Sequence, residues 1–291
     1  MIRLSTFENR KFETIKNISQ ETFDEIQLDS EILKVTYTQF VIFKNLQING
    51  TEYSKFLDKI SNLHIGTVDI KKIHSQELLF QANRVILNLL SSFKFYIDNG
   101  EAHLKRKYGK DSDVSKEFRK LTSNEFDNVF AYRFLIKLRN YSLHLGFPLQ
   151  GLELKAEKNI ETPIKTTGSL QLSIDIDLIK KEKNLLGKIV YDDIKNLKED
   201  IDLKPLIVDI SLSILKIQKF VFTKQKDEIE NAISNLETFA GKYKTETNDI
   251  KVFNNLKRNG DVIEFNAYHI PFEIITEFKR YIKTTHNKKM S

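Results

Sequence analysis

The 291-residue chain contains no cysteine, which excludes disulfide bonds, thiolate metal sites and cysteine nucleophiles. Glycine and proline are few, at 10 and 4 residues, and there is no low-complexity tract, so long disordered linkers are not expected. The most apolar long run, 206–222, is interrupted by Asp209, Lys216 and Lys219, and no span of about 20 apolar residues forms. The N-terminal sequence lacks the apolar core and cleavage site of a signal peptide. These absences predict a cytoplasmic protein that does not bind membranes.

Several common catalytic patterns are also missing from the sequence. There is no Gly-x4-Gly-Lys-Ser/Thr phosphate loop, no Gly-x-Gly-x-x-Gly nucleotide fingerprint and no Gly-x-Ser-x-Gly nucleophile elbow. The six histidines never occur at the spacing of metal ligands. We therefore expect neither a metal site nor a cofactor.

The composition is that of a soluble globular protein, with 40% hydrophobic and 30% charged residues. The length predicts one to two domains with a sizeable core. The net charge of 46 − 40 = +6 and the pI near 9.1 favour polyanionic partners, but only mildly. A composition rich in lysine and isoleucine is equally compatible with a protein that binds no polyanion.

The patterning predicts an α+β fold, mainly α, in which flanking strands and helices surround a central helical bundle. We expect three consecutive regions: a mixed α/β module over 1–73, a helical core over 74–150 and an α+β region over 151–291. In the first region, the β-branched and aromatic residues of 32–43 predict a strand or a pair of strands, and Asn49-Gly50 predicts a turn.

A long helix is predicted over 75–107, where apolar residues recur every three or four positions. Its polar side carries small uncharged groups, among them Asn83 and Ser92. Two alternatives explain them: contact with another helix, for example across a dimer, or polar groups satisfied within the chain. A basic cluster follows at the end of this helix, formed by Lys105, Arg106 and Lys107. These three residues are candidates for contacts with phosphate, although a solvated loop would look the same.

Beyond residue 150 the sequence predicts alternating strands and helices. Residues 152–157 and 169–178 are expected to pair as a hairpin, and 249–270 form a second hairpin around Asn259-Gly260. Helices are expected over 203–223, 227–243 and 271–283.

The stretch 126–148 carries the most distinctive chemistry of the chain. Spacings of 4, 3 and 4 place Arg133, Lys137, Asn140 and His144 on one stripe of a predicted helix. Gly146 and Pro148 are expected to end that helix, and Ser123 is a plausible N-cap.

His144 is thereby placed in the last helical turn, beside unpaired carbonyl groups. This environment favours a positive charge at the end of the helix. A histidine of this kind beside guanidinium and amide donors suits acid–base chemistry on a phosphodiester. The alternative is a histidine that only caps the helix, beside a solvated stripe of basic residues.

The run Arg139-Asn140-Tyr141-Ser142-Leu143-His144 fits the Arg-x4-His motif of the HEPN superfamily, whose members are mostly small helical RNA-cleaving or RNA-binding domains. The helix before it and the sequence FAYRFLIKLRNYSLHLGFP resemble a group of uncharacterised bacterial HEPN-like proteins. The resemblance covers roughly residues 74–150, about a quarter of the chain. It implies a metal-independent endoribonuclease that acts as a homodimer, and a bacterial toxin or anti-phage effector held in check by an antitoxin or other regulatory partner.

The resemblance also implies roles for individual residues. Arg139 would bind the scissile phosphate, His144 would move protons during attack of the ribose 2′-hydroxyl, and Asn140 would orient the phosphate or the histidine. RNA-binding roles fall to six further residues, with Tyr141 either stacking on a base or packing in the core: Arg133, Lys137, Tyr141, Lys105, Arg106 and Lys107.

Arg139 and His144 are separated by about 140° around an ideal helix. We therefore expect Arg139 of one chain to meet His144 of another across a two-fold dimer. The alternative function is a non-catalytic RNA-binding or assembly module of the same type, which would bind RNA without cutting it.

Overall fold

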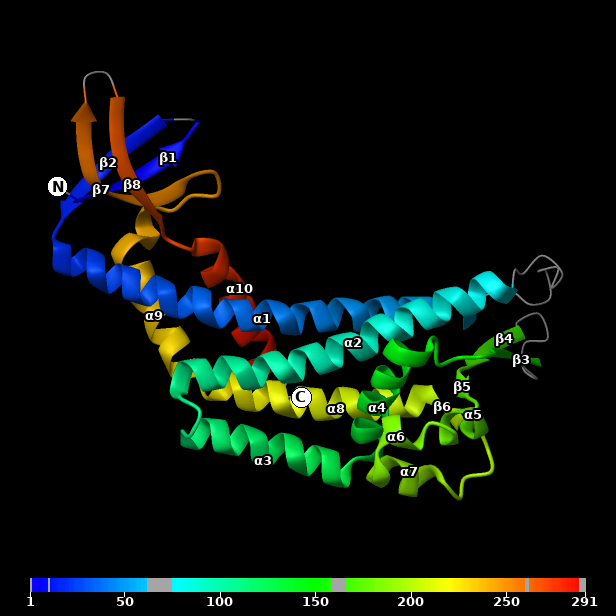
Figure 1. Ribbon diagram of the computed structural model, residues 1–291. Coiled ribbons are helices and arrows are strands. Elements are labelled where there is room, and N and C mark those ends of the chain that lie inside the picture. Colours follow the sequence, from blue (N-terminus) through cyan, green and yellow to red (C-terminus); the bar gives the residue numbers. More distant parts are fainter. Residues whose placement is uncertain (1, 10, 62–74, 159–165, 260–261, 288–291) are drawn as a thin grey trace. The chain divides into compact units, whose positions relative to one another are not determined.

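The computed structural model describes residues 2–9, 11–61, 75–158, 166–259 and 262–287 (Figure 1). Helices dominate this part of the chain, and a small antiparallel sheet accompanies them. The prediction of an α+β, mainly α fold is confirmed. Within the described residues, no helix is both long enough and apolar enough to cross a membrane.

The chain divides into two compact units, and neither boundary matches the three consecutive regions predicted from the sequence. The first unit joins Met1–Phe40 to Phe222–Ser291, and the second is Val41–Val221. The boundaries fall within two helices, α1 (Gln20–Ser61) and α8 (Leu203–Thr223). The first unit therefore combines the two ends of the sequence, which a division into consecutive segments does not anticipate.

The first unit contains a four-stranded antiparallel sheet in the order β2-β1-β7-β8. Leu4, Ile250 and Val252 are fully buried on the sheet face that meets the helices. The C-terminal hairpin is confirmed, although Gly260 of its predicted turn lies outside the described residues; the N-terminal hairpin was not predicted. The elements are β1 (Ile2–Glu8), β2 (Lys11–Ile18), α9 (Lys226–Ala240), a 3₁₀ turn (Gly241–Tyr243), β7 (Asp249–Asn259), β8 (Val262–His269) and α10 (Phe272–Asn287).

The strand predicted over 32–43 is wrong, because these residues lie within α1. Buried side chains recur along this helix at a helical period, as at Leu33, Phe40 and Phe43. Their packing, including Phe40 against Phe278 at 5.3 Å between ring centroids, outweighs the β-propensity of the branched residues. The turn predicted at Asn49-Gly50 is wrong for the same reason, since α1 continues through both residues.

The second unit is built on a bundle formed by the last part of α1, α2 (Ser75–Tyr108), α3 (Asp113–Asn128) and α8. Phe43 of α1 contacts Tyr96 of α2, and the Tyr96 hydroxyl donates to Gln218 of α8 at 2.7 Å. The buried Glu125 carboxylate of α3 accepts hydrogen bonds from Ser213 and Lys216 of α8. The long helix predicted over 75–107 is confirmed as α2.

Short elements complete the second unit (Figure 1). The predicted hairpin is confirmed, but its second strand ends early. The side chain of Asp175 accepts a hydrogen bond from the Leu178 amide and starts a helix where the alternating pattern predicted more strand. The elements are β3 (Glu153–Lys158), β4 (Thr166–Gln171), β5 (Ser173–Ile174), α5 (Ile176–Lys180), α6 (Lys183–Leu186), α7 (Lys188–Ile194) and β6 (Ile201–Asp202).

Candidate functional site

The motif residues lie on α4 (Phe130–Leu145), which packs against α2, α3 and α7. Phe134, Leu135 and Leu138 are fully buried and fix the face that α4 turns to the core. The N-cap predicted at Ser123 is wrong, because Ser123 lies inside α3. The helix is interrupted at Val129, which precedes α4 and makes no side-chain cap. The predicted stop is confirmed, because the chain leaves the helix at Gly146 with φ 104°, a conformation that favours glycine.

Asn83 of α2 holds the segment that follows α4. Its side-chain amide donates to the Leu149 carbonyl, its side-chain oxygen accepts from the Leu149 amide, and both distances are 3.0 Å. The ring of Phe147 also contacts Phe80 of α2, with centroids 6.0 Å apart. Of the two alternatives for Asn83, the structure thus selects the one in which the polar group is satisfied within the chain.

The three catalytic candidates occupy the last two turns of α4. His144 is exposed and makes no hydrogen bond to the part of the chain that the structure describes. Arg139 is half-buried, and its Nη1 donates to Asn140 Oδ1 at 3.2 Å. Its Nε is buried without a hydrogen-bond partner in the described residues.

The hydrogen bond between Arg139 and Asn140 alters the relation between Arg139 and His144. The two α-carbons lie about 140° apart around the helix, whereas Asn140 lies only about 40° from His144. The guanidinium of Arg139 reaches the side chain of Asn140, so it is drawn toward the stripe that carries His144. The three side chains therefore end closer around the helix than their α-carbons suggest.

Arg133 begins the same stripe, and its donors are occupied within the protein. Its Nε and Nη2 bind the Asp193 carboxylate of α7 at 2.6 and 3.1 Å, and its Nη1 donates to two carbonyls, of Phe126 at 3.2 Å and Asp127 at 3.0 Å. The hydrogen bond to Asp193 raises the pKa of Arg133 further. Arg133 therefore anchors the first turn of α4 to α7. No local pattern identifies its partner, which lies 60 residues away in the sequence.

Lys137 and Tyr141 face neighbouring elements of the second unit. The ammonium of Lys137 lies beside Gly187, 3.6 Å from where a β-carbon on that glycine would be. Tyr141 is only 5% exposed, and burial raises the pKa of its hydroxyl, with Glu182 and Asp175 adding to the effect. A ring this buried offers no face on which a base can stack.

The basic cluster at the end of α2 is not brought next to His144. Asn83 marks the part of α2 that meets the end of α4, and Lys105 lies 22 residues further along the same helix. At 1.5 Å per residue, this separation is about 33 Å. Lys105 pairs with Glu101 at 2.6 Å, whereas Arg106 is exposed and its Nε donates to a backbone carbonyl.

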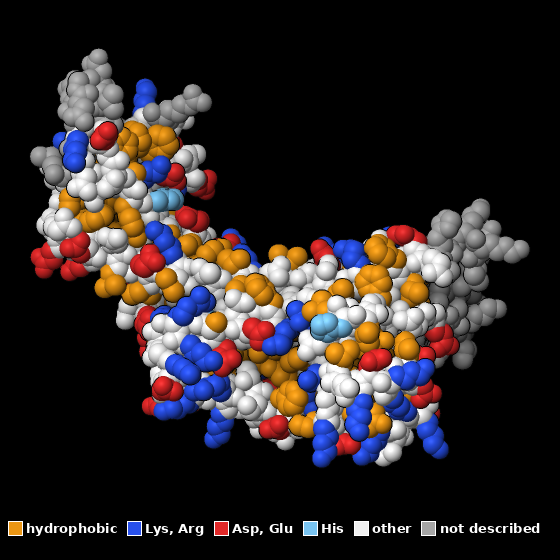
Figure 2. Space-filling model, viewed as in Figure 1, with side chains coloured by type: hydrophobic (Ala, Val, Ile, Leu, Met, Phe, Trp, Pro, Cys, Tyr) orange, Lys and Arg blue, Asp and Glu red, His pale blue; other side chains and the backbone are white. Residues whose placement is uncertain are grey.

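Large apolar side chains are exposed around His144. Leu143, Leu145 and Phe147 are 53%, 50% and 41% exposed, and Phe80 beside Phe147 is 47% exposed. Figure 2 shows hydrophobic side chains interspersed with lysine and arginine on the face in view. Exposed apolar groups gathered in one place are typical of surfaces that contact another molecule.

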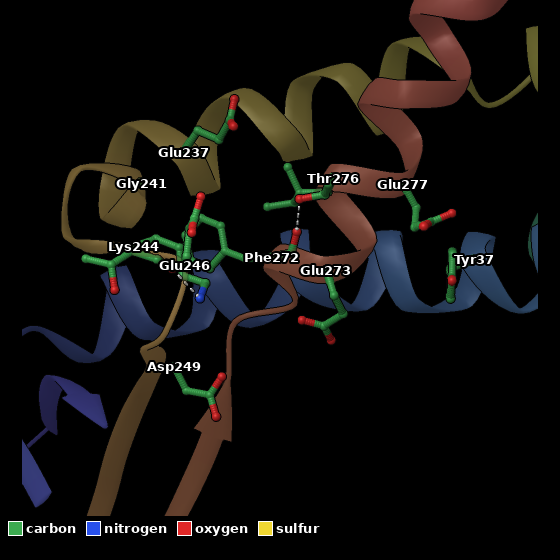
Figure 3. Close-up of a pocket in the computed structure, with 12 residues that line it drawn as sticks. Tyr37, Glu237, Gly241, Lys244, Glu246, Asp249, Phe272, Glu273, Thr276 and Glu277 are labelled. Carbon is green, nitrogen blue, oxygen red and sulfur yellow. Dashed lines mark hydrogen bonds between the residues drawn. The ribbon is translucent and has the colours of Figure 1, made fainter. Parts of the chain in front are cut away.

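A separate cavity of about 870 Å³ lies within the first unit, away from the motif in the sequence (Figure 3). Lys279 binds one of its carboxylates, Glu237, at 2.8 Å. The excess of carboxylates would repel a phosphate, so we do not place this cavity on a path for RNA. Within the described residues, no group of three or more His, Asp or Glu side chains is arranged to hold a metal ion. The acidic residues that line the cavity are Glu237, Glu246, Asp249, Glu273 and Glu277.

Comparison of the chain with protein-family models, with curated proteins and with solved structures found no match.

Proposed function

We propose that this protein is a metal-independent endoribonuclease of the HEPN type, with Arg139, Asn140 and His144 as its reacting residues. The observation that carries the proposal is the arrangement at the end of α4. An exposed histidine lies in the last turn, and a guanidinium is held toward its stripe by an amide. These groups provide a proton carrier and cationic and polar donors, which cleavage of a phosphodiester requires.

In the proposed reaction, the ribose 2′-hydroxyl attacks the neighbouring phosphorus and the bond to the 5′-oxygen of the next nucleotide breaks. His144 takes the proton from the attacking hydroxyl or gives one to the leaving 5′-oxygen, and water takes or gives the other proton. Arg139 stabilises the negative charge that develops on the phosphate, and Asn140 orients the guanidinium. The products are a cyclic phosphate and a 5′-hydroxyl, and DNA is resistant because it lacks the attacking group.

A second copy of the chain completes the proposed site. The hydrogen bond to Asn140 narrows the separation of Arg139 and His144 around the helix, but the described side chains of one copy make no contact between the two. A two-fold axis would bring Arg139 of one copy toward His144 of the other. The exposed Leu143, Leu145 and Phe147 flank His144 and supply apolar surface for such contact. Lys137 contributes positive charge from the preceding turns of α4.

The basic cluster at the end of α2 would contact RNA beyond the cleavage site, because about 33 Å separates it from the motif end of α4. We place the activity in the cytoplasm, as a growth-arrest or anti-phage effector that an antitoxin or other regulatory partner holds in check. Expression should then arrest growth, and His144→Ala should relieve the arrest. Equal arrest by both proteins would argue against this role.

The direct test is incubation of the purified protein with total RNA in EDTA, which removes divalent metal ions. We expect wild-type protein to cut RNA, and His144→Ala and Arg139→Ala to lower the rate by about 100-fold or more. Asn88→Ala changes an exposed amide on α2 and serves as the matched control.

Two outcomes of this test would contradict the proposed reaction. Cleavage by His144→Ala at the wild-type rate would remove His144 from the mechanism. RNA that is bound but remains intact with the wild-type protein would instead favour a non-catalytic RNA-binding module.

A further inference from the structure

The four-stranded sheet of the first unit carries a cluster of phenylalanines, one from each strand. Phe12 of β2 lies 4.6 Å from Phe7 of β1 and 4.9 Å from Phe253 of β7, measured between ring centroids. Phe265 of β8 lies 5.0 Å from Phe253 and 6.3 Å from Phe12. The four rings therefore form one continuous group across the whole width of the sheet, which we call the phenylalanine platform.

Strand register places this platform on the face of the sheet opposite the helices. Val252 pairs with Leu4, and both are fully buried on the helical side. Phe253 is the next residue along β7, so its side chain points to the other face. Phe7 and Phe12 are direct partners in the register and share that face. The helices of the first unit thus cover one side of the sheet and leave the platform on the other.

Two rings of the platform are open to solvent and one lies beneath them. Phe12 is 51% exposed and Phe265 is 43% exposed, whereas Phe253 is 7% exposed because the other two rings cover it. Phe253 meets both outer rings edge to face, and Phe7 lies against Phe12 with 32° between the ring planes. These contacts hold the outer rings in place, while about half of Phe12 and of Phe265 stays open to solvent. The sheet therefore presents large aromatic surfaces on a rigid support.

Cationic groups accompany the rings on this face. The Lys251 ammonium lies 4.5 Å from the centre of the Phe7 ring, and Arg3 is the register partner of Phe253. The carboxylate of Asp249, which the register also assigns to this face, lies 3.8 Å from His269 Nε2. Among the described side chains, the platform thus combines aromatic surface with positive charge.

We propose that the phenylalanine platform binds single-stranded nucleic acid. Bases stack on Phe12 and Phe265, whose exposed rings accept any base, and Lys251 and Arg3 bind the phosphates that connect the bases. An apolar protein partner fits this face less well, because it would desolvate the Lys251 ammonium without supplying a counter-charge. A phosphodiester strand supplies both a π-surface and a negative charge at each nucleotide.

Binding at the platform does not depend on the proposed α4 site, and a DNA ligand allows binding to be measured without cleavage. A fluorescently labelled oligothymidylate of about 12 nucleotides has bases to stack but no 2′-hydroxyl for the α4 residues to use. We expect the full chain to bind it in a fluorescence anisotropy titration at low salt. Failure of the chain to bind this oligonucleotide at micromolar concentration would overturn the platform and would leave the nuclease proposal untouched.

Variants of the outer rings test stacking directly. Phe12→Ala and Phe265→Ala should each weaken binding by about 5- to 150-fold. Phe95→Ala, which removes a ring that is 50% exposed on α2, should leave binding unchanged. Equal affinity for all three variants would overturn the proposal. Circular dichroism of each variant shows whether its fold is retained. Ultraviolet crosslinking of the oligonucleotide to wild-type protein, mapped by mass spectrometry, should mark peptides of the four strands. Crosslinks found only outside these strands would refute the proposal.

Two further variants separate stacking from apolar contact and test the charge. Phe12→Leu keeps apolar bulk but removes the π-face, so it should weaken binding nearly as much as Phe12→Ala. Wild-type affinity of Phe12→Leu for the oligonucleotide would overturn stacking at Phe12 and leave only apolar contact there. Lys251→Gln should reduce the slope of log affinity against log salt by about 0.7; an unchanged slope would remove Lys251 from the phosphate contacts.

Discussion

At the scale of single residues, two arginines on α4 have opposite surroundings. Arg133 has a carboxylate and two carbonyls as partners and is 13% exposed. Among the described residues, Arg139 bonds only to the neutral amide of Asn140, and its Nε is buried without a hydrogen-bond partner. A half-buried guanidinium with so few hydrogen bonds contributes little to the stability of the fold. Such an arrangement is typical of a residue retained for function.

This contrast predicts how each arginine responds to replacement by methionine, which keeps most of the side-chain volume. Arg133→Met should lower the free energy of unfolding by about 2 kcal/mol, because it leaves the Asp193 carboxylate and two carbonyls without their donor. Arg139→Met should stay within about 1 kcal/mol of wild type, since it removes an unsatisfied donor, yet it should abolish cleavage.

Urea unfolding followed by circular dichroism measures both stabilities, and the EDTA cleavage assay measures the activity. A large loss of stability in Arg139→Met would show that its guanidinium is mainly structural. A stable Arg133→Met protein would show that the pair with Asp193 contributes little.

At the scale of secondary-structure elements, the end of α4 depends on α2. The helix stops at Gly146, and the chain beyond it is fixed where Leu149, 2% exposed, exchanges two hydrogen bonds with Asn83. His144 lies only two residues before the stop, so the direction of the last turn depends on this attachment. The contact between Phe80 and Phe147 supports the same segment.

Asn83→Ala should therefore affect both stability and activity. It leaves a buried amide and a buried carbonyl of Leu149 unpaired, which should cost about 2 kcal/mol of unfolding free energy. Cleavage should also fall, because a small displacement of His144 is enough to misplace a catalytic group. Asn99→Ala, which removes an amide that donates to the Phe95 carbonyl of its own helix, should change stability by less than about 0.5 kcal/mol. Equal unfolding midpoints for the two variants in urea would disprove the attachment.

At the scale of the whole molecule, the proposed site needs two chains. If Arg139 of one copy acts with His144 of the other, a mixed dimer of Arg139→Ala and His144→Ala contains one site with both residues intact. Co-expression of the two inactive variants should then restore up to about half of the activity of wild type for the fraction that forms mixed dimers. Without any recovery, the shared-site arrangement would be untenable.

The exposed apolar residues near His144 give an independent test of the dimer. Leu143→Asp should convert the protein to a monomer in light scattering at micromolar concentration and should abolish cleavage, because a charge cannot be buried unpaired in the contact. Leu212→Asp on α8 places the same charge on a residue that is 61% exposed and should change neither property. A wild-type protein that is already monomeric would exclude the contact.

Much of the secondary structure follows from the sequence alone. The helical periodicity of 75–107 predicted α2, the pattern of 203–223 predicted α8, and the Asn259-Gly260 turn signal within 249–270 predicted the β7–β8 hairpin. The stop at Gly146 was also predictable, because only glycine readily adopts the conformation that ends the helix there. These features depend on residues a few positions apart, so a local pattern is sufficient to define them.

What only the tertiary structure decided involves residues that are distant in the sequence. Residues 32–43 form helix because side chains spaced at a helical period pack against partners such as Phe278. Local β-propensity contains no information about these distant partners. Arg133 became an anchor because Asp193 faces it, and Asn83 found its partner at Leu149, 66 residues away. The sequence supplies the periodicity and the end signals of each element, whereas the partner of each polar or aromatic side chain depends on which elements pack together.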